Sequence, residues 1–296
     1  MSEIWSSGRP QAEQDVDEER ARELIQAQFA PLSEQSLVAL SEGWDYAVFL
    51  VDEIWTFRFP RREVVVAGTE REIAVLPRLE VPVAVPRPTH VGVASDAFPW
   101  PFYGARYIPG DEAVGLDDDA RALLARPLAR FLRALHAHDL DLPVDLQRRS
   151  DMSFRVPRTR QALAAIGDLW HSPPLVEDVL REAEVLPLAE PTAVVHGDLH
   201  FRQLLVRERE LSGVIDWVDV CRADPGQDLL LVWSFLSPAA RVQFLDEYGP
   251  VSEESLLRGR VLALGLNASL ARYGRDEGLP AIEAEALAGL ERAALD

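Results

Sequence analysis

Lysine is absent from this chain, so all 30 of its basic residues are arginine. The single cysteine, Cys221, excludes an internal disulfide, and with no further thiol it makes no zinc site of the cysteine type. No apolar run approaches the roughly 18 residues that a membrane span needs. The first 20 residues are polar and acidic rather than signal-like, so a cytoplasmic location without membrane partners is expected.

Positive charge is also scarce, because 49 acidic residues outweigh the 30 arginines and give a formal net charge of -19. Such a charge repels phosphate backbones and removes the main contribution to nucleic-acid affinity. Nucleic acids are therefore excluded as expected partners. Attraction of a cationic ligand and a merely solvated acidic surface both remain open.

At 296 residues, 48% of them hydrophobic, the chain is long enough for two domains with a substantial core. The first half predicts an opening helix over 15–29, strands over 36–40, 46–51 and 54–59, a helix over 69–79 and two further strands near 89–95 and 102–108. After 109 the pattern becomes helical, beginning with the amphipathic stretch 117–138. We place the domain boundary there, giving an N-terminal domain of residues 1–108 and a C-terminal domain of residues 109–296.

Two strand-like pieces interrupt the later helices, and they carry the strongest motif in the chain. VVHGDLHFRQLLV occupies 194–206 and SGVIDW occupies 212–217. Phosphoryl transfer from a nucleotide needs a carboxylate to orient the attacking hydroxyl, and further oxygen ligands to hold magnesium on the phosphates. Asp198, Gln203 and Asp216 could supply these groups from one loop and a nearby hairpin.

This combination resembles the catalytic and metal loops of the aminoglycoside phosphotransferase family, which is itself similar to protein kinases. The resemblance implies that Asp198 is the catalytic base, that His196 braces the loop, and that Gln203 and Asp216 hold Mg²⁺. Most relatives carry Asn at the position of Gln203. A structural turn without catalytic function and a catalytically inactive relative are the alternatives.

The same resemblance extends to the N-terminal half. It implies that Gly43 and Trp44 belong to the loop over the nucleotide, that Arg58 replaces the usual phosphate-binding lysine, and that Glu72 is its acidic partner. Taken by themselves, Gly43 is explained by a plain hairpin turn, and an arginine in a strand with a glutamate in a helix is most often a surface pair.

Residues 102–110 resemble the hinge of that family, where backbone groups of Ala105, Arg106 and Tyr107 would bind the purine of ATP or GTP. Asp224 opens a predicted helix in the run DPGQD and is interpreted as a helix cap. His136 closes a helix, where a positive group suits the helix dipole, and no catalytic role is assigned to it.

The resemblance implies an α/β (α+β) fold of the protein-kinase type, with a small antiparallel β-sheet lobe and a mainly helical lobe. It also implies a kinase that moves the γ-phosphate of ATP or GTP to a hydroxyl of an aminoglycoside-like or macrolide-like antibiotic. A metabolic kinase for small alcohols or sugars and a pseudokinase without turnover are the rival functions. If the acceptor is a polycation, acidic side chains of the C-terminal half should face it, with these candidates: Asp228, Asp246, Glu247, Glu253 and Glu254.

Overall fold

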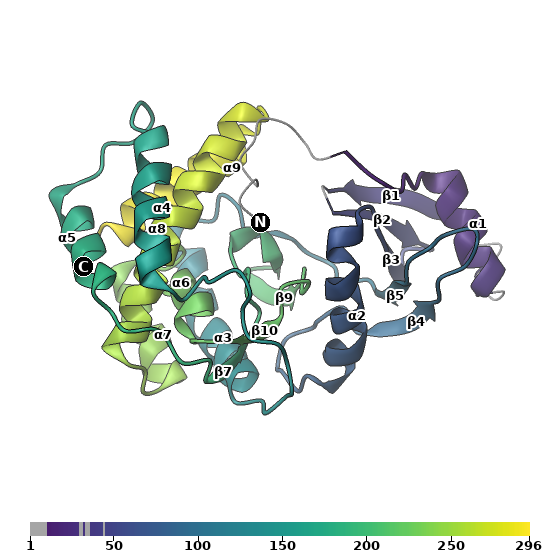
Figure 1. The fold of residues 1–296 in the computed structure, drawn as a ribbon, viewed down its shortest axis with the longest axis horizontal. Coiled ribbons are helices and arrows are strands. Elements are labelled where there is room, and N and C mark those ends of the chain that lie inside the picture. Colours follow the sequence, from purple (N-terminus) through teal and green to yellow (C-terminus); the bar gives the residue numbers. More distant parts are fainter. Residues whose placement is uncertain (1–10, 30–31, 33–35, 44) are drawn as a thin grey trace. The chain divides into compact units, whose positions relative to one another are not determined.

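A computed structural model describes residues 11–29, 32, 36–43 and 45–296 of the chain (Figure 1). The chain divides into two compact units, the first running to Leu79 and including Val85–Ile108, the second made of Glu80–Ala84 and Pro109–Asp296. Within these described residues, no helix is long and apolar enough to cross a membrane. The two units are described separately below.

The first unit is built on a five-stranded antiparallel sheet with the order β1-β2-β3-β5-β4. Its strands are β1 (Leu37–Glu42), β2 (Tyr46–Val51), β3 (Trp55–Pro60), β4 (Pro88–Gly92) and β5 (Phe102–Arg106). Asp52 and Glu53 join β2 to β3 with φ values of 52° and 56°, as a tight hairpin turn requires at both central positions. The predicted antiparallel sheet is confirmed.

Alternation along β3 gives the two faces of this sheet different roles. Phe57 and Phe59 are fully buried in one aromatic cluster, where Phe59 stacks on Phe102 with ring centroids 4.5 Å apart. Helix α1 (Glu18–Gln28) adds Leu24 and Ile25 to the same cluster. Successive side chains of a strand point to opposite faces, so Arg58 is directed away from this core.

Helix α2 (Val66–Val75) and the short turn Leu76–Arg78 follow β3 in the chain. The helix buries Glu72 and Thr69, and Thr69 is hydrogen-bonded to the hydroxyl of Tyr46 in β2 at 2.9 Å. Helix α1 begins at Glu18 because the Asp17 carboxylate accepts the N–H of Arg20 at 2.8 Å. It is therefore shorter at both ends than the predicted stretch 15–29.

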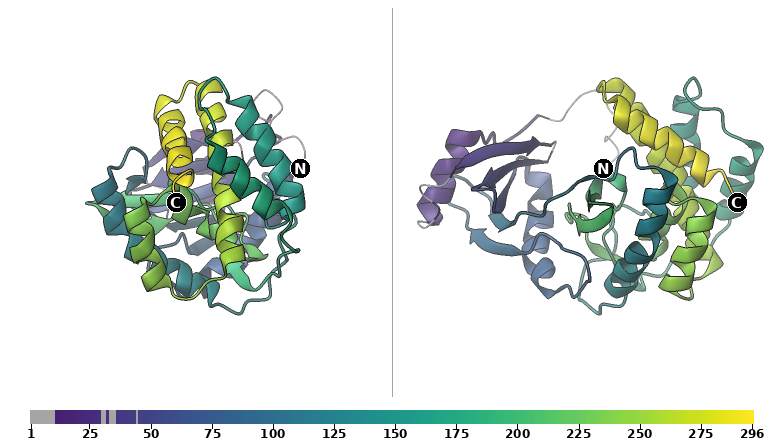
Figure 2. Two further views of the ribbon diagram at one scale, coloured as in Figure 1. Left: turned by 90° about the vertical axis from the view of Figure 1, so that its left-hand side faces the viewer. Right: turned by 180° about the vertical axis from the view of Figure 1, so that it is seen from behind.

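The second unit is mainly helical, and α8 packs against α4, α5, α6 and α9 (Figure 2). Gly259 of α8 lies where a Cβ would come 3.0 Å from the carbonyl oxygen of Gly226 in α6, so glycine permits the close packing of these two helices. The helices are α3 (Asp118–His136), α4 (Met152–Ala165), α5 (Pro174–Glu184), α6 (Gly226–Ser234), α7 (Pro238–Tyr248), α8 (Glu253–Asp276) and α9 (Pro280–Ala293).

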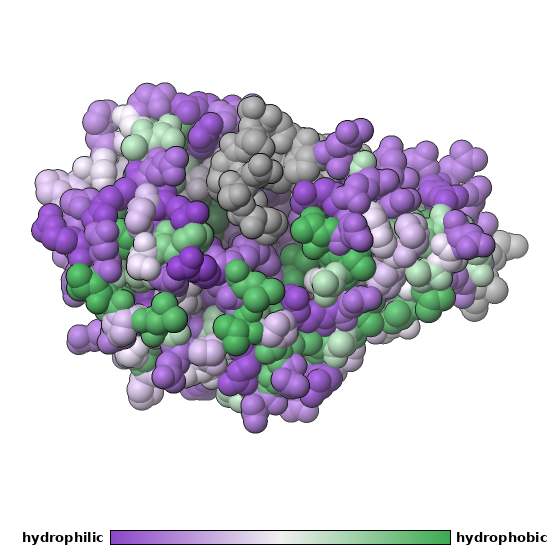
Figure 3. Space-filling model, in the orientation of Figure 1, coloured by the Kyte–Doolittle hydropathy of each residue, from purple (hydrophilic) through white to green (hydrophobic). Residues whose placement is uncertain are grey.

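Short strands interrupt these helices and hold the loops of the candidate site. One sheet pairs β7 (Ala193–Val195) with β10 (Cys221–Ala223), and the other has the order β6-β8-β9. Its strands are β6 (Asp111–Glu112), β8 (Leu204–Arg207) and β9 (Glu210–Val214). The sequence pattern did not predict β6 and β10, and β9 ends at Val214 rather than at 217. Figure 3 shows the mostly hydrophilic surface seen from the side of Figure 1.

Candidate active site

The loop between β7 and β8 carries Asp198 and is tied to the segment that carries Asp216. His196 Nε2 lies 2.9 Å from the carbonyl oxygen of Ile215, and His196 Nδ1 lies 3.4 Å from the backbone nitrogen of Asp198. This pattern fits a neutral ring that donates from Nε2 and accepts at Nδ1. Burial lowers the pKa of His196 and favours that neutral form. The imidazole is therefore a brace between two loops.

Asp228 in α6 holds the same loop from its other side. Its carboxylate accepts the N–H of His196 at 2.8 Å and the N–H of Gly197 at 3.0 Å. His136 Nε2 lies 3.1 Å from the same carboxylate. Burial alone would raise the pKa of Asp228, but the hydrogen bond and charge of His136 bring it below its ordinary value. Asp228 is thus an ionised anchor of the loop that carries Asp198.

These contacts correct the prediction for Asp228 and add partners for Glu247 and for His136, which closes α3 as predicted. Asp228 is fully buried, so it cannot face an acceptor. Glu247 forms ion pairs with the arginines of α3, at 3.0 Å to Arg130 and at longer distances to Arg126 and Arg133. His136 supports Asp228 and lies 2.7 Å from the Tyr248 hydroxyl, which is a larger role than complementing a helix dipole.

Gly197 is required by the backbone of this loop. Its φ is +94°, and a Cβ there would lie 2.4 Å from the carbonyl oxygen of Asp219. Only glycine adopts this conformation and permits this approach without strain. The residues following Asp216 are therefore packed directly against the residue preceding Asp198.

Asp198 is a partly buried residue directly after Gly197. Burial raises its pKa to about 7, against the attraction of Arg149 and with the added repulsion of Asp219, Asp216 and Asp228. A general base works best when its pKa lies near the operating pH. The environment thus suits Asp198 to accepting a proton near neutrality.

Gln203 and Asp216 offer oxygen atoms with the chemistry that a hard cation prefers. Gln203 Oε1 is buried without a hydrogen-bond partner in the described part of the chain. The backbone oxygen of Gln203 accepts the N–H of Ile215 at 3.0 Å, which joins the two segments, and Asp216 has a left-handed φ of 66°. A buried carbonyl-type oxygen and a carboxylate fit Mg²⁺.

Asp216 is two residues beyond the end of β9 rather than inside a strand. Among the described residues, no group of three or more His, Cys, Asp or Glu side chains could hold a metal by itself. An ion on Gln203 and Asp216 would therefore take its remaining ligands from phosphate and water, as magnesium commonly does.

In the first unit, Arg58 and Glu72 form a buried ion pair. Arg58 Nη1 lies 3.1 Å from Glu72 Oε1, and their side chains are 11% and 0% exposed. The guanidinium also lies over the ring of Tyr46, 4.2 Å from its centroid. The surface-pair interpretation of these two residues is therefore wrong, because the glutamate is in the interior of the unit.

The loop between β1 and β2 is described only in part, since Trp44 lies outside the described residues. The Gly43 carbonyl accepts a hydrogen bond from Arg61 Nη1 at 2.9 Å, and the Gly43 N–H donates one to the Tyr46 carbonyl at 2.9 Å. A Cβ at Gly43 would make an ordinary contact of 3.6 Å with that same carbonyl oxygen. Local packing therefore does not demand glycine at position 43.

The predicted purine-binding backbone lies at the end of β5. Ala105 is paired with Thr56 in the ladder between β3 and β5. The N–H of Tyr107 donates to the Ile54 carbonyl at 2.7 Å, so this donor is already used within the unit. The Arg106 guanidinium lies over the Trp55 ring, 5.3 Å from its centroid. Arg106 is likewise paired with Trp55 in the ladder between β3 and β5.

Asp224 was predicted to cap α6, but the N-cap is Pro225, which makes no side-chain cap hydrogen bond, and Asp224 lies one residue before it. Its Oδ1 accepts the N–H of Gly226 at 2.8 Å in the first turn of α6, and its Oδ2 accepts the Ser255 hydroxyl at 3.0 Å. Cys221 is buried in β10, and burial raises the pKa of its thiol to about 12. Neither residue has a chemical role in the site.

The sequence interpretation missed a charged cluster beside Asp198. Arg149 Nη2 lies 2.7 Å from Asp219 Oδ2, and Arg149 Nη1 lies 3.2 Å from Asp145 Oδ1. Burial would lower the pKa of Arg149, but the charges of Asp219, Asp198 and Asp145 raise it above its ordinary value. The only available signal was the density of arginine between 148 and 160.

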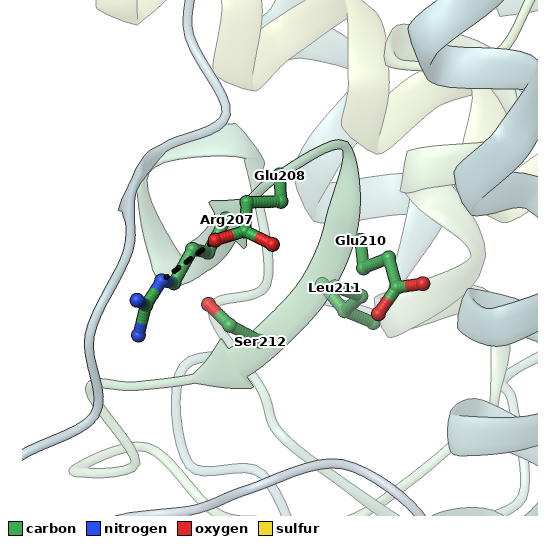
Figure 4. A pocket seen from close by; sticks show the side chains of 5 residues that line it. All are labelled: Arg207, Glu208, Glu210, Leu211 and Ser212. Carbon is green, nitrogen blue, oxygen red and sulfur yellow. Dashed lines mark ion pairs between the residues drawn. The ribbon is translucent and has the colours of Figure 1, made fainter.

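A shallow hollow of about 340 Å³ lies on the β8–β9 hairpin. Figure 4 shows Arg207 and Glu208 at its rim, joined by an ion pair of 3.7 Å, with Leu211 and Ser212 from β9. Glu208 and Arg209 form the hairpin turn with positive φ values of 54° and 66°. None of the candidate catalytic or metal-binding residues lines this hollow.

Comparison with known proteins places this arrangement in a wider group. The sequence model described as "APH: Phosphotransferase enzyme family" matches residues 36–261. Aminoglycoside 3'-phosphotransferases of Escherichia coli and Salmonella typhimurium are 30% and 31% identical over 149 and 160 residues. These matches cover 45% and 48% of this chain and 52% and 56% of the relatives, so the similarity spans about half the length of each relative.

Solved structures resemble the fold over a larger part of the chain. The GDP and kanamycin complex of APH(2")-IIia has a TM-score of 0.67 at 24% identity, covering 92% of this chain and 97% of that chain. The apoenzyme of macrolide 2'-phosphotransferase MphH from Brachybacterium faecium has a TM-score of 0.56 at 22% identity, covering 86% and 92%. The predicted kinase-like α+β fold is therefore confirmed. The chain belongs to the phosphotransferase enzyme family.

Proposed function

We propose that this chain transfers the γ-phosphoryl group of ATP or GTP to a hydroxyl group of a small molecule, with magnesium as cofactor. The observation that carries the proposal is the link between two loops, in which His196 Nε2 lies 2.9 Å from the Ile215 carbonyl. That link couples the segment of Asp198 to the segment of Asp216. Family membership and the relatives' names support the same reaction class.

Asp198 is assigned as the general base. Its carboxylate accepts the proton of the acceptor hydroxyl as the oxygen of that hydroxyl forms a bond to the γ-phosphorus. The bond between the γ-phosphorus and the β,γ-bridging oxygen breaks, and the nucleoside diphosphate leaves. His196 and Asp228 hold the loop, so that the base is positioned before the reaction begins.

Gln203 and Asp216 are assigned to Mg²⁺, which when bound neutralises charge on the phosphates. Arg58 is assigned to the nucleotide phosphates, with Glu72 orienting its guanidinium. Gly43 and Trp44, and the backbone of Ala105, Arg106 and Tyr107, are assigned to the nucleotide. These roles follow the family resemblance, and the ion pair of Arg58 with Glu72 supports the roles of those two residues.

Nucleotide consumption measured with Asp198→Asn tests the proposal. The variant should keep its affinity for the nucleotide and lose turnover by about 10²- to 10⁴-fold, because the base alone is removed. Kanamycin and a macrolide, erythromycin, belong in the first acceptor panel because similar proteins are named aminoglycoside and macrolide phosphotransferases. Turnover of either would support antibiotic resistance as the role. A variant that retains most of the wild-type rate would contradict the assignment. No transfer to any acceptor would favour the pseudokinase.

A further inference from the structure

Two contacts of different kinds hold the buried guanidinium of the first unit. Arg58 Nη1 lies 3.1 Å from Glu72 Oε1, and Arg58 Cζ lies over the ring of Tyr46, 4.2 Å from the ring centroid. An aromatic face attracts a cation within about 6 Å of its centroid, and arginine can stack on such a face. The guanidinium is thus held by a carboxylate at one nitrogen and by an aromatic ring at its central carbon.

The ladder between β2 and β3 explains why Tyr46 and Arg58 meet. Tyr46 is paired with Pro60, and Arg58 lies two residues before Pro60 on the same strand. Residues two apart in a strand share a face, so Tyr46 and Arg58 are diagonal neighbours, within reach of each other for an aromatic and a long side chain. This face is opposite to the one that carries Phe57 and Phe59 into the aromatic cluster.

Helix α2 holds both residues through one of its own faces. Thr69 and Glu72 are three positions apart, so they are neighbours on the helix surface. Thr69 Oγ1 lies 2.9 Å from the Tyr46 hydroxyl and 3.1 Å from the carbonyl oxygen of Val65. Burial and the charge of Glu72 raise the pKa of Tyr46, so the phenol stays neutral. The hydroxyl anchors the tyrosine to α2, while the neutral ring contacts Arg58.

The orientation of an arginine matters more than that of a lysine. An ammonium is a point charge, whereas a guanidinium is planar and binds a phosphate best through two parallel hydrogen bonds. Two such bonds form only when the plane of the group faces the phosphate correctly. A side chain that is already ordered loses less entropy when it binds. A residue that orients Arg58 would therefore strengthen the binding of phosphate without touching it.

We propose that Tyr46 is a positioning residue for the nucleotide, whose ring fixes the plane of the Arg58 guanidinium so that this group binds two phosphate oxygens at once. This inference rests on the proposed function, which assigns Arg58 to the nucleotide phosphates. It adds Tyr46 to that site as the residue that makes arginine effective in place of the usual lysine. Tyr46 acts through Arg58 rather than on the nucleotide itself.

The test compares nucleotides that differ in their phosphates. Calorimetric titration of the whole chain with magnesium measures the affinities for ATP, ADP and adenosine, or for the guanine series if GTP is the better substrate. Wild type is compared with Tyr46→Phe, Tyr46→Leu, Arg58→Lys and the double variant of Tyr46→Leu with Arg58→Lys. Phe49→Leu is the control, because Phe49 is on the same strand but belongs to the aromatic cluster of the other face.

Tyr46→Leu should weaken the binding of ATP about tenfold, because the aromatic contact that orients the guanidinium is lost, and should leave adenosine within about twofold. Tyr46→Phe keeps the ring and should bind ATP within about twofold of wild type. Phe49→Leu should leave the ratio of the ATP and adenosine affinities unchanged. An unchanged ATP affinity in Tyr46→Leu, or an equal loss of ATP and adenosine affinity, would overturn the inference.

The double variant separates positioning from a general loss of structure. An ammonium has no plane to orient, so Tyr46→Leu should weaken ATP binding at most about twofold when Arg58→Lys is also present. A merely structural role of Tyr46 would give the same loss in both backgrounds, and that result would overturn the inference.

Fluorinated phenylalanines at position 46 replace Tyr46→Leu if that variant does not fold. Fluorine withdraws negative charge from the face of the ring and changes its shape little. The affinity for ATP should therefore fall as fluorine atoms are added, while the affinity for adenosine stays the same. Equal ATP affinities along the series would overturn the inference.

Two further outcomes separate this inference from the proposed function. If Arg58→Lys binds ATP as tightly as wild type and wild type transfers phosphate, the plane of the guanidinium is unimportant, and the inference is wrong while the function stands. If wild type transfers phosphate to no acceptor, while the variants show the expected pattern of ATP affinities, the proposed reaction fails and the role of Tyr46 stands.

Discussion

His196 Nε2 lies 2.9 Å from the carbonyl oxygen of Ile215, the residue immediately before Asp216. One buried side chain thereby joins the loop of the proposed base to the loop of the proposed metal ligand. Asp228 adds a second constraint by accepting the N–H of His196 itself. A change that displaces one of these loops should therefore displace the other as well.

His196→Phe should lower turnover about 100-fold, because a small misplacement of a catalytic group can cost that much. The aromatic ring would still pack on Trp217, whose centroid lies 4.6 Å away, so folding should be largely kept. The magnesium concentration for half-maximal rate should rise as well, which a purely structural defect would not cause. His171→Phe, at an exposed position, is the control. An unchanged magnesium dependence would contradict the coupling.

Asp216→Ala should weaken nucleotide binding about tenfold or more in the presence of magnesium, because a hard cation loses an anionic ligand. Without magnesium, wild type and variant should bind nucleotide equally. Calorimetric titration under both conditions measures the difference. Asp246→Ala, at an exposed position of α7, should behave as wild type. Equal affinities of wild type and Asp216→Ala with magnesium present would remove Asp216 from the metal site.

Regular elements could be predicted from the sequence because their composition or their period is characteristic. The strands around Phe49 and Phe57 are rich in β-branched and aromatic residues and are separated by turn-prone residues, and 117–138 is amphipathic, so the sheet and α3 were expected in nearly the right place. Strands β6 and β10 could not be predicted. They contain two and three residues, too few to show a period, and they form only by pairing with β8 and β7.

The candidate site was predictable in the same uneven way. Asp198, Gln203 and Asp216 could be named as candidates because they lie within one short stretch of sequence with a characteristic spacing. Asp228 was seen only as an acidic residue, since its contact with the His196 backbone depends on how α6 packs under a loop about 30 residues away. Glu72 is buried because of how α2 packs in the first unit, and the sequence pattern does not predict that packing.

Glu72→Ala should destabilise the first unit by about 3 to 5 kcal/mol, because Arg58 would lose the buried carboxylate that balances its charge. Hydrogen exchange of peptides from β3 and α2, followed by mass spectrometry, localises the effect to this unit. Glu70→Ala, at an exposed position of the same helix, should change exchange little. Replacing both members of the pair with Arg58→Met and Glu72→Leu should restore most of the protection. If these peptides exchanged as slowly in Glu72→Ala as in wild type, the ion pair would not stabilise the unit.

The raised pKa of Asp198 predicts a gain in stability when the proposed base is removed. The pKa of Asp198 in the folded protein is about 7, above the ordinary value of 3.8. At a pH between these two values, the folded protein keeps a proton on Asp198 that the unfolded chain has released. Stability contributed by this group therefore falls as pH rises from about 4 to about 7 and is constant above that. The accumulated loss at pH 8 is up to about 4 kcal/mol.

Asp198→Asn cannot ionise, so its advantage over wild type should grow from pH 5 to pH 7 and then level off. At pH 8 the midpoint of thermal unfolding should rise by at least about 5 °C for a unit of this size. Unfolding curves of the metal-free, nucleotide-free protein at pH 5, 6, 7 and 8 measure the trend. Asp141→Asn, at an exposed position of the same unit, should show no such trend. If Asp198→Asn and wild type melt together across this range, the interior around Asp198 does not oppose its charge, and its suitability as a base near neutrality needs another origin.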